Sequence, residues 1–444
     1  MSTKVTIVVP SYNSETVIGQ CMDSILAQTF KDFEVIVVDD ESTDNTVAIA
    51  QEYAEKDSRV KVVPKKHENA GISRNVGIDM AEGDYIVFWD SDDYFELNAL
   101  ELMYNKCIED DADICLCDAW HYNEMLQRDE NGLKIDPEYL PEKIPFSRKD
   151  IPDTIYNVTA NVPWNKMFRL KFINDNKIRF QSLPKANDAY FNLMTMALAD
   201  SITVVNEKLV HWRYNQEMKS TTTDSKRSPM HVFEAFEAAY KDLNDLGVYE
   251  EIRMSFLNKA LGSYLYVLSC QQGLDNLDNF RQVYDYIRDK GLREFGFDTV
   301  KEEDVQKQKK FERLQYVVDG SYEEYILWRE AANKQSLNNR CKNAFAKIRR
   351  REEKIERLEN KIERLQAKIE RLNQKYDRMK NSFAYRVGMK VTWLPRKINA
   401  LINGKPDTSE KKEEKEEVIE NEVENIIENE QEVVIENDSE NEEM

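Results

Sequence analysis

The sequence predicts an α/β fold with a mostly parallel sheet, followed by a helical region and a C-terminal coiled coil. Strand-like and helix-like segments alternate over residues 1–120, and helical spacing replaces the strand pattern after about residue 225. A heptad repeat of apolar residues then follows Cys341. At 444 residues the chain is long enough to form two or three folding units with full-sized cores.

The predicted strands of the sheet are short apolar runs rich in β-branched residues. They cover residues 4–10, 34–40, 60–64, 85–89 and 113–119. Apolar residues at helical spacing predict the intervening helices over residues 14–29, 43–55, 73–81 and 97–108. In a parallel sheet of this kind a ligand binds beyond the carboxyl ends of the strands, so polar residues at the strand ends are the candidates for a site.

The second half of the chain carries helical patterns of two kinds. Amphipathic spacing predicts a small bundle over residues 231–243, 251–268, 277–289 and 322–333. Beyond it two series recur every seven residues, the second placed three residues after the last four members of the first. The first is Ile348, Ile355, Ile362, Ile369 and Tyr376, and the second is Leu358, Leu365, Leu372 and Met379. Isoleucine in one series and leucine in the other favour a parallel two-stranded coiled coil, so we expect a homodimer joined through residues 345–380.

Charge is distributed unevenly along the chain, whose formal net charge is −21. Residues 405–444 carry −13 and are expected to form a disordered acidic tail, whereas residues 341–404 carry +11. The remaining −19 on residues 1–340 excludes a generally basic nucleic-acid-binding surface there. Aromatic and basic residues are interleaved over 382–404, which suggests contact with an anionic lipid surface; a helix docked on the protein's own core is the alternative.

No run of about 18 apolar residues could span a membrane, and the N-terminal residues lack the apolar core of a secretory signal. We therefore expect a cytoplasmic protein, with residues 382–404 as a peripheral contact with the inner face of the cell membrane. The six cysteines lie mostly in apolar runs and are expected to be reduced, buried thiols, and the four histidines are too scattered for a zinc site. Oxygen ligands are the expected metal chemistry.

Three predicted strands end in polar clusters. These are Pro10-Ser11-Tyr12-Asn13 after the first strand, Asp39-Asp40-Glu41-Ser42 after the second and Asp90-Ser91-Asp92-Asp93 after the fourth. Crowded carboxylates repel one another unless a cation or ligand donors compensate, so a divalent cation is the expected cofactor. A P-loop kinase or a dinucleotide-binding dehydrogenase is not indicated, because neither type of glycine-rich phosphate loop follows a strand.

The order of these motifs resembles that of the family-2 glycosyltransferases, which have a GT-A fold. The matching segments are Val-Pro-Ser-Tyr-Asn at 9–13, Val-Asp-Asp-Glu-Ser-Thr-Asp at 38–44, Asn-Ala-Gly-Ile-Ser-Arg-Asn at 69–75, Asp-Ser-Asp-Asp at 90–93, Trp-Asn-Lys at 164–166, Asn-Asp at 187–188 and Trp-Arg-Tyr-Asn at 212–215. The resemblance covers roughly residues 4–220. It implies an inverting, metal-dependent hexosyltransferase that moves a sugar from a nucleotide diphosphate sugar, expected to be a UDP-sugar. The acceptor would be a hydroxyl of a glycan or a lipid-linked molecule in surface polysaccharide or glycan biosynthesis.

The acidic cluster is expected to hold the cation. Asp92 is placed to ligate Mg²⁺ or Mn²⁺, and such an ion stabilises a departing diphosphate as a Lewis acid. The resemblance implies that Asp90 contacts the ribose or shares the metal, and Asp93 would add a supporting oxygen. The competing interpretation is a helix N-cap before residues 97–108, for which one aspartate would suffice.

The resemblance places the nucleotide against the first two strand ends. Asp39 and Asp40 would contact the base, and Arg74 would pair with the base or the phosphates. One wall of the base pocket would be formed by Pro10, Tyr12 and Asn13. Glu41 stands where the family usually has glycine, which puts the geometry of that turn in question. Capping of the next helix by Ser42 or Thr43, and a surface salt bridge for Arg74, are the structural alternatives.

The remaining candidates belong to the acceptor side. Asp188 matches the family's acidic pair at the start of a helix and is the expected general base, so that the reaction is a single displacement with inversion. Trp164 and Lys166 resemble the acceptor motif, and Trp164 could stack on a sugar. Arg213, with Asn215, matches an arginine-containing strand end near the diphosphate. An N-cap role for Asp188 and a core position for Trp164 are the alternatives.

The expected domains are a GT-A domain at 1–222, a helical domain at 223–338, a coiled coil at 339–381, a basic amphipathic segment at 382–404 and an acidic tail at 405–444. Two other functions were weighed. A nucleotidyltransferase also pairs carboxylate-bound metal with a nucleotide, but typically has a glycine-rich basic loop where Ser11 to Ser14 stand here. A non-catalytic coiled-coil scaffold with a vestigial domain is disfavoured by the joint presence of Asp39, Asp90, Asp92 and Asp188.

Overall fold

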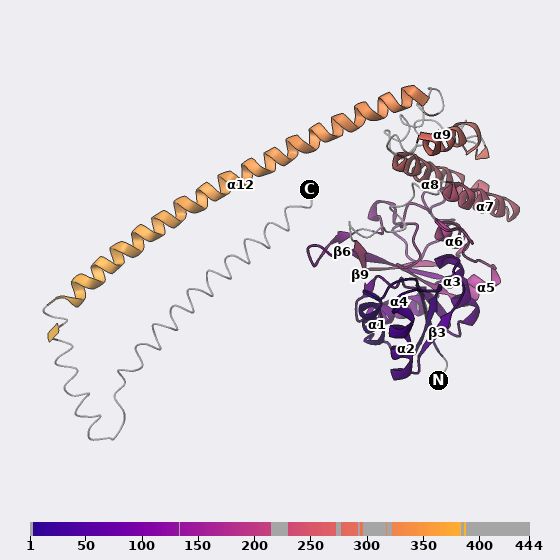
Figure 1. Ribbon diagram of the computed structural model, residues 1–444, viewed down its shortest axis with the longest axis horizontal. Helices are drawn as coiled ribbons and strands as arrows, with labels where there is room; N and C mark the ends of the chain where they lie inside the picture. Colours follow the sequence, from indigo (N-terminus) through magenta and orange to yellow (C-terminus); the bar gives the residue numbers. More distant parts are fainter. Residues whose placement is uncertain are drawn as a thin grey trace, which may run out of the picture. The chain divides into compact units, whose positions relative to one another are not determined.

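The computed structural model describes residues 3–132, 134–214, 230–271, 277–291, 294–295, 317, 322–382 and 386–387. The chain divides into two compact units, residues 1–331 and 332–444. The first unit contains a nine-stranded sheet with the strand order β3-β2-β1-β4-β8-β6-β9-β5, and β7 pairs with β6 (Figure 1). The expectation of an α/β fold is therefore confirmed.

Four parallel strands form one half of the sheet. They are β1 (Val5–Ser11), β2 (Phe33–Asp39), β3 (Val60–Pro64) and β4 (Tyr85–Phe88). Every residue of β1 and β2 is buried, because helices cover both faces of the sheet. One face is covered by α1 (Ile18–Leu26), α2 (Thr46–Lys56) and α4 (Ala99–Glu109), and the other by α3 (Ala70–Met80). These elements confirm the predicted strands and helices to within a few residues at their ends, and the free thiols of Cys21 and Cys107 are buried among them.

The other half of the sheet is mixed, but six of the nine described strands still run in one direction, so the expectation of a mostly parallel sheet is confirmed. It contains β8 (Lys166–Arg169), β6 (Ile114–Asn123), β9 (Ile202–Tyr214), β5 (Tyr94–Phe95) and β7 (Arg128–Gly132). β6 and β9 run parallel, but β8 is antiparallel to both β4 and β6, and β5 and β7 are antiparallel to their neighbours. Strands as short as β5, β7 and β8 carry too little alternation to be recognised in a sequence.

The register of the strands brings the polar strand ends together. Ser11 at the end of β1 pairs with Asp39 at the end of β2, and Val8 pairs with Phe88 at the end of β4. The hydroxyl oxygens of Ser14 and Ser91 lie 2.9 Å apart and tie the loop after β1 to the acidic loop after β4. The carboxyl ends of these three strands therefore form one edge, as the parallel arrangement predicts.

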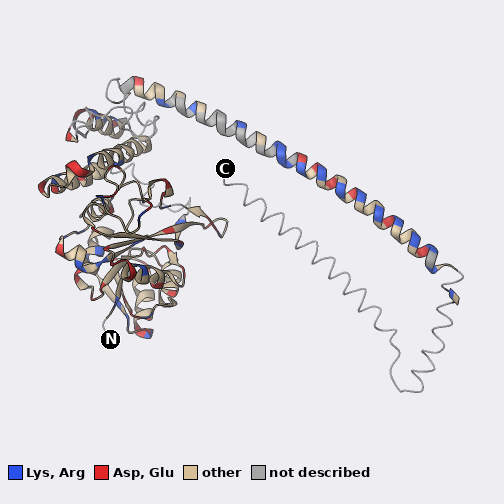
Figure 2. Ribbon diagram, turned by 180° about the vertical axis from the view of Figure 1, so that it is seen from behind, with Lys and Arg blue, Asp and Glu red and all other residues tan. Residues whose placement is uncertain are grey.

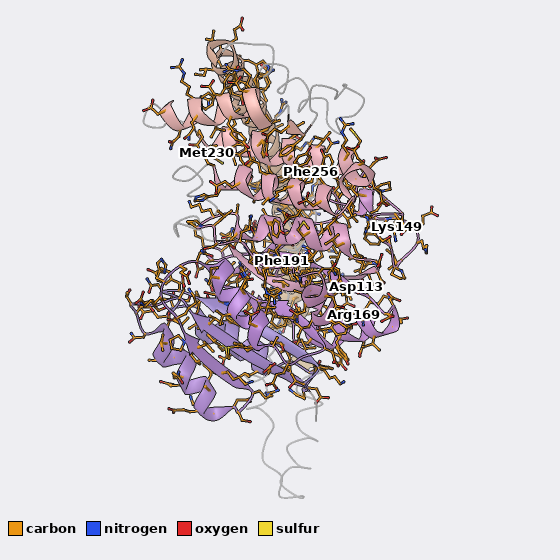
Figure 3. All side chains as sticks on the ribbon, turned by 90° about the vertical axis from the view of Figure 1, so that its right-hand side faces the viewer. Asp113, Lys149, Arg169, Phe191, Met230 and Phe256 are labelled. Atoms are coloured by element: carbon orange, nitrogen blue, oxygen red, sulfur yellow. The ribbon has the colours of Figure 1, made fainter. Side chains whose placement is uncertain are left out.

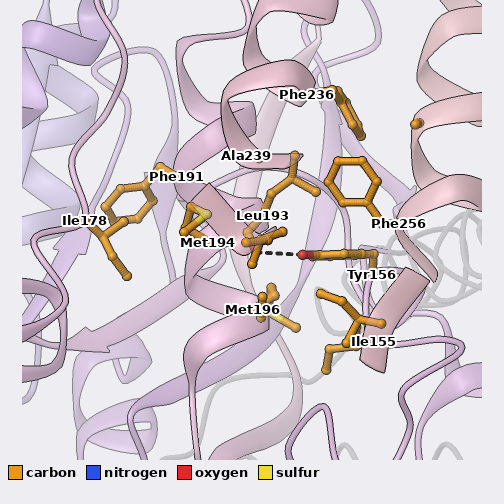
Figure 4. Close-up of a cluster of buried hydrophobic side chains, with 14 of the residues drawn as sticks. Ile155, Tyr156, Ile178, Phe191, Leu193, Met194, Met196, Phe236, Ala239 and Phe256 are labelled. Atoms are coloured by element: carbon orange, nitrogen blue, oxygen red, sulfur yellow. Dashed lines mark hydrogen bonds between the residues drawn. The ribbon is translucent and has the colours of Figure 1, made fainter. Parts of the chain in front are cut away.

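A helical layer packs on the α3 face of the sheet. It is formed by α5 (Leu170–Asp175), α6 (Asn187–Leu198), α7 (His231–Asp245) and α8 (Tyr249–Cys270), and α9 (Leu277–Tyr286) continues into a π-helical turn at Ile287–Gly291. Phe191 of α6 lies between the sheet and the outer helices, where Phe256 is found (Figure 3). The Tyr156 hydroxyl donates a hydrogen bond of 3.0 Å to the Leu193 carbonyl within this core (Figure 4). The core is thus continuous from the sheet to α8, and the domain boundary after residue 222 stays a prediction.

The last predicted bundle helix and the coil segment form one helix, α12 (Tyr322–Lys380). Near its start Tyr325 is buried, with its ring centroid 5.8 Å from that of Phe280, whereas residues 353–378 are all exposed. The helix is as expected, and its pairing as a coiled coil stays a prediction. Asn215, nearly all of the basic segment at 382–404 and the tail at 405–444 lie outside the described residues. Each helix that is described is too short or too polar to cross a membrane.

Truncation of Phe191 tests the continuity of the core between sheet and helices. Its ring stacks on Phe180 at 3.9 Å between centroids and meets Phe88 at 5.5 Å. Phe191→Ala leaves a cavity at this junction, and we expect the free energy of unfolding to fall by about 3–5 kcal/mol in chemical denaturation. Leu246→Ala, at a residue 57% exposed, is the control and should change it by less than about 0.5 kcal/mol. Equal effects of the two substitutions would contradict the packing described here.

Candidate active site

The loop after β4 brings three carboxylates together. Asp90, Asp92 and Asp93 each offer one oxygen, and these oxygens lie within 4.8 Å of one another. Divalent cations bind oxygen ligands at about 2.0–2.6 Å, so ligands on opposite sides of one ion have about this separation. The cap interpretation fails, because α4 begins after Asn98 and its N-cap is therefore not one of the three aspartates.

Arg213, on β9, binds the acidic loop through its backbone and its side chain. Its backbone N–H donates to Asp93 Oδ1 at 2.9 Å, and its guanidinium Nε donates to the Asp92 carbonyl at 2.8 Å. The remaining guanidinium nitrogens donate to Glu124 and Gln20, and the side chain is only 6% exposed. The expected contact of Arg213 with a diphosphate is therefore replaced, in the described contacts, by support of the loop that carries the carboxylates.

The electrostatics of the loop fit a cation. Desolvation by the crowded surrounding protein atoms and the negative charge of Asp90 raise the pKa of Asp92 to about 6, although Asp92 is the one residue of the three that is exposed at the surface. Burial, followed by the charges of Asp92 and Asp90, raises the pKa of Asp93, whose second oxygen is buried without a hydrogen-bond partner among the described residues. Three mutually repelling carboxylates with an unsatisfied oxygen are destabilising on their own, and a divalent cation among them would relieve both problems.

Arg74 connects the acidic loop to the helical layer. Its guanidinium donates from Nη2 to Asp90 Oδ1 at 2.6 Å and from Nη1 to Asn187 Oδ1 at 3.2 Å. The side chain is 7% exposed and lies over the ring of Phe180, so the surface salt-bridge alternative is wrong. Because Asn187 is the first residue of α6, this single side chain fixes the start of that helix relative to the acidic loop.

Asp188 lies in the first turn of α6, next to this bridge. The N-cap of the helix is Ala186, in a left-handed conformation with φ of 54°, so Asp188 is not the capping residue. Burial raises the pKa of Asp188, the positive charges of Arg74 and Lys166 oppose that rise, and the charge of Asp90 adds to it. A carboxylate held near a cation site with a raised pKa suits proton transfer, since its pKa is moved toward neutral pH.

The two aspartates after β2 are buried and bound within the chain. Asp39 accepts hydrogen bonds from the Ser42 N–H at 2.9 Å and from the Ser42 hydroxyl. Asp40 pairs with Lys65 and accepts from the Glu68 N–H at 3.0 Å. These contacts shape the loop that would receive a nucleotide base, and α2 begins after Asn45 rather than after Ser42 or Thr43.

Two of the predicted base-pocket residues, Tyr12 and Asn13, lie at this edge of the sheet. The ring of Tyr12 is 47% exposed, and Asn13 accepts a hydrogen bond from the Thr43 N–H at 2.8 Å. Glu41, where glycine was the usual residue, adopts a φ of 64°, so the turn keeps the left-handed geometry that glycine allows. Pro10 lies within buried β1, one residue before the strand end.

His67 was missed by the sequence reasoning. Its ring centroid lies 4.5 Å from that of Tyr12, and its Nδ1 lies 3.0 Å from Asp40 Oδ2. The signal that could have found it is its position three residues after β3, at the same edge of the sheet as the three polar strand ends. Together Tyr12 and His67 give this edge two neighbouring rings against which a planar base could pack.

The predicted acceptor residues lie in the interior. Trp164 is 4% exposed and belongs to the core of the sheet, which favours its structural alternative. Lys166 is fully buried and its ammonium donates to the Ala160 and Val162 carbonyls and to Asn165 Oδ1. Burial lowers the pKa of Lys166 to about 7. Lys166 therefore shapes the loop at 160–163, and Trp164 is part of the packed core.

Gly71 also escaped attention, although it lies in a recognised motif. A Cβ atom at this position would lie 2.6 Å from the Gln181 carbonyl oxygen and 2.9 Å from Asn187 Cβ. Only glycine therefore lets α3 approach the start of α6 closely enough for Arg74 to reach Asn187. The glycine itself was the signal in the sequence. The need for glycine at this position comes from α6, a segment more than a hundred residues away along the chain.

Comparisons with known proteins agree on one family. Residues 6–176 match the family model described as glycosyl transferase family 2. Glycosyltransferase GlyG of Streptococcus pneumoniae is 38% identical over 220 residues, which are 48% of this chain and 71% of GlyG. Glycosyltransferase GlyA of the same organism is 31% identical over 218 residues, 47% of this chain, but these span only 30% of GlyA.

The fold has a counterpart among solved structures. The crystal structure of Staphylococcus aureus TarS residues 1–349 in complex with UDP-GlcNAc matches with a TM-score of 0.57 and 24% identity, over 75% of this chain and 92% of that chain. At this identity the match establishes the shared GT-A type of fold.

Substitution of Gly71 tests the close approach of α3 and α6. In Gly71→Ala the new methyl group meets backbone and Cβ atoms that cannot turn aside, so we expect the free energy of unfolding to fall by about 1–3 kcal/mol. Gly19→Ala is the matched control, because a Cβ there meets only the Tyr53 hydroxyl at an ordinary 3.8 Å within helix α1. The control should stabilise by about 0.5–1 kcal/mol, and the same sign for both variants would contradict this geometry.

Proposed function

We propose, on the premise that this chain belongs to glycosyltransferase family 2, that it transfers a sugar from a nucleotide diphosphate sugar to an acceptor hydroxyl with inversion. The observation that carries the proposal is the Arg74 bridge, which joins the acidic loop at Asp90 to the start of α6 at Asn187. A cation-binding loop and a carboxylate of raised pKa are thereby held on two sides of one site. That is the arrangement that a single displacement at an anomeric carbon requires.

The acidic loop is the proposed cation site. Asp92, the exposed member of the three, is the main ligand for Mg²⁺ or Mn²⁺, Asp90 shares the ion or contacts the ribose, and Asp93 supports it from below. Bound there, the ion would supply Lewis-acid stabilisation of the diphosphate leaving group. Arg213 keeps the loop in place through the Asp92 carbonyl and the Asp93 carboxylate.

Asp188 is the proposed general base. It would take the proton of the acceptor hydroxyl as that oxygen attacks the sugar from the side opposite the diphosphate, so the product anomer is inverted. The positive charge of Arg74 keeps Asp188 from becoming too basic, because it opposes the rise in pKa that burial causes. The loop held by Lys166, next to Trp164 in the chain, is the proposed boundary of the acceptor side.

The proposed donor is a UDP-sugar. Its base would pack against Tyr12 and His67 beside Pro10, Asn13 and the loop organised by Asp39 and Asp40. The TarS match is to a complex with UDP-GlcNAc, which supports a uridine nucleotide here. A glycan or lipid-linked acceptor in surface polysaccharide assembly, and a cytoplasmic protein resting on the inner membrane face through 382–404, complete the proposal.

Two carboxylate variants test the division of labour. Asp92→Asn should abolish metal-dependent UDP binding and turnover, whereas Asp188→Asn should keep UDP and Mn²⁺ binding but lose about 10²–10⁴-fold in transfer rate. UDP binding is measured by calorimetry with Mn²⁺ or EDTA, and transfer by UDP release from a panel of UDP-sugars, with product anomers assigned by NMR. Asp153→Asn, at an exposed aspartate, is the control and should behave as wild type.

The same measurements separate the alternatives. Pyrophosphate as the released product would favour a nucleotidyltransferase. A wild-type chain with neither turnover nor metal-dependent nucleotide binding would favour a scaffold. Loss of UDP binding in Asp188→Asn would remove the assignment of Asp188 as base.

The charge of Arg74 gives a pH prediction for the reaction. The base must be deprotonated, so the rate falls as pH drops through the pKa of Asp188, and Arg74 lowers that pKa. Arg74→Gln should therefore move the acid limb of kcat/KM to higher pH, while Arg74→Lys, which keeps the charge, should move it less. The profile is measured at saturating metal, with UDP binding followed at each pH to exclude loss of the nucleotide. An unmoved limb, or one shifted to lower pH, contradicts the proposed role.

A further inference from the structure

The C-terminal part of α12 carries an apolar seam that the described chain leaves open to solvent. Six side chains form it, each between 40% and 57% exposed: Ile355, Leu358, Ile362, Leu365, Ile369 and Leu372. They recur at alternating steps of three and four residues, so they line one side of the helix. A long helix with such a seam and no tertiary cover is marginal as an isolated element and requires a partner.

The charges that flank the seam favour one orientation of a paired helix over the other. With the Ile355 series as position a and the Leu358 series as position d, all five g positions are lysine. These are Lys347, Lys354, Lys361, Lys368 and Lys375. The e positions from residue 352 onward are Glu352, Glu359, Gln366, Asn373 and Lys380. Figure 2 shows acidic and basic residues closely interleaved along this part of α12.

An antiparallel pair of these helices is disfavoured by charge. In an antiparallel pair g positions face g positions, so every such contact would set lysine against lysine. In a parallel pair each g position faces the e position five residues further along the other helix. Lys354 then meets Glu359, the next two lysines meet neutral amides, and only Lys375 meets another lysine.

We propose that α12 pairs with α12 of a second copy of this chain, in parallel and in register, through the Ile355–Leu372 seam. Isoleucine at a with leucine at d is the core that favours two parallel strands. The Lys354–Glu359 pair, made twice across the dimer, favours this direction and register. Both copies of residues 1–331 are then joined to the same end of the paired helices.

Cysteine cross-linking tests direction and register in the full chain. In a Cys341→Ser background, Leu358→Cys and Leu372→Cys are each oxidised mildly and analysed on non-reducing gels. A parallel, in-register pair sets each cysteine against its own counterpart, so both variants should form covalent dimers. Asn360→Cys, on the opposite side of the helix at position f, is the control and should stay monomeric on the gel. Cross-linking at only one of the two seam sites would indicate an antiparallel pair and overturn the proposal.

Charge reversal tests the same proposal by sedimentation and without any cross-link. Lys354→Glu places glutamate against Glu359 in the parallel pair and should weaken dimerisation by about tenfold. Adding Glu359→Lys should restore it, and Arg364→Glu, at the outward position c, should leave it unchanged. In an antiparallel pair Lys354→Glu would relieve lysine repulsion and strengthen association. That result, or a wild-type chain that is monomeric at micromolar concentration, overturns the proposal, while circular dichroism confirms that each variant keeps its helix.

Discussion

The buried guanidinium of Arg74 is the interaction on which the rest of the site depends. It binds one carboxylate of the acidic loop and the side-chain amide at the start of α6, two segments almost a hundred residues apart. The parallel half of the sheet supplies the carboxylates of the proposed cation site, and the helical layer supplies Asp188. Without a positive charge between them, the negative charge of Asp90 would act on Asp188 unopposed from that side. Gly71 permits the contact, because α3 and α6 lie so close together at this position that there is no room for a Cβ atom.

Repulsion among the carboxylates explains how this part of the chain is ready for a cation. Burial raises the pKa values of Asp92 and Asp93, and the charges of the neighbouring carboxylates raise them further. The loop keeps its shape because groups outside the cluster hold it: Arg213 binds the Asp92 carbonyl, and the Ser14 hydroxyl contacts the Ser91 hydroxyl. The electrostatic repulsion therefore persists, because the loop cannot move its carboxylates apart. Binding of a divalent ion would lower this repulsion energy most directly.

Much of this arrangement could be predicted from the sequence, and the failures have physical causes. The parallel strands were recognised because buried β-branched runs are a local signal, and the acidic cluster because strand ends are where ligands bind. The antiparallel strands β5 and β8 were missed because they are too short to show a pattern. The direction in which a side chain points was the second feature that the sequence could not predict. Lys166 and Arg213 carry the right charge for a ligand, yet both turn inward to backbone carbonyls, which no sequence spacing reveals. His67 and Gly71 depend on neighbours brought in by the fold.

Three residues around the site adopt left-handed backbone conformations although none is glycine. They are Asn13, Glu41 and Ala186, at the ends of β1 and β2 and immediately before α6. Such a conformation is unfavourable by roughly 1–2 kcal/mol for a residue with a Cβ, least so for asparagine. The turns that would hold the base and the proton acceptor are therefore also where the folded chain has free energy still to gain. Glycine in place of Glu41 or Ala186 would relieve this strain, and the same substitution would loosen the turn that would hold the base or the proton acceptor.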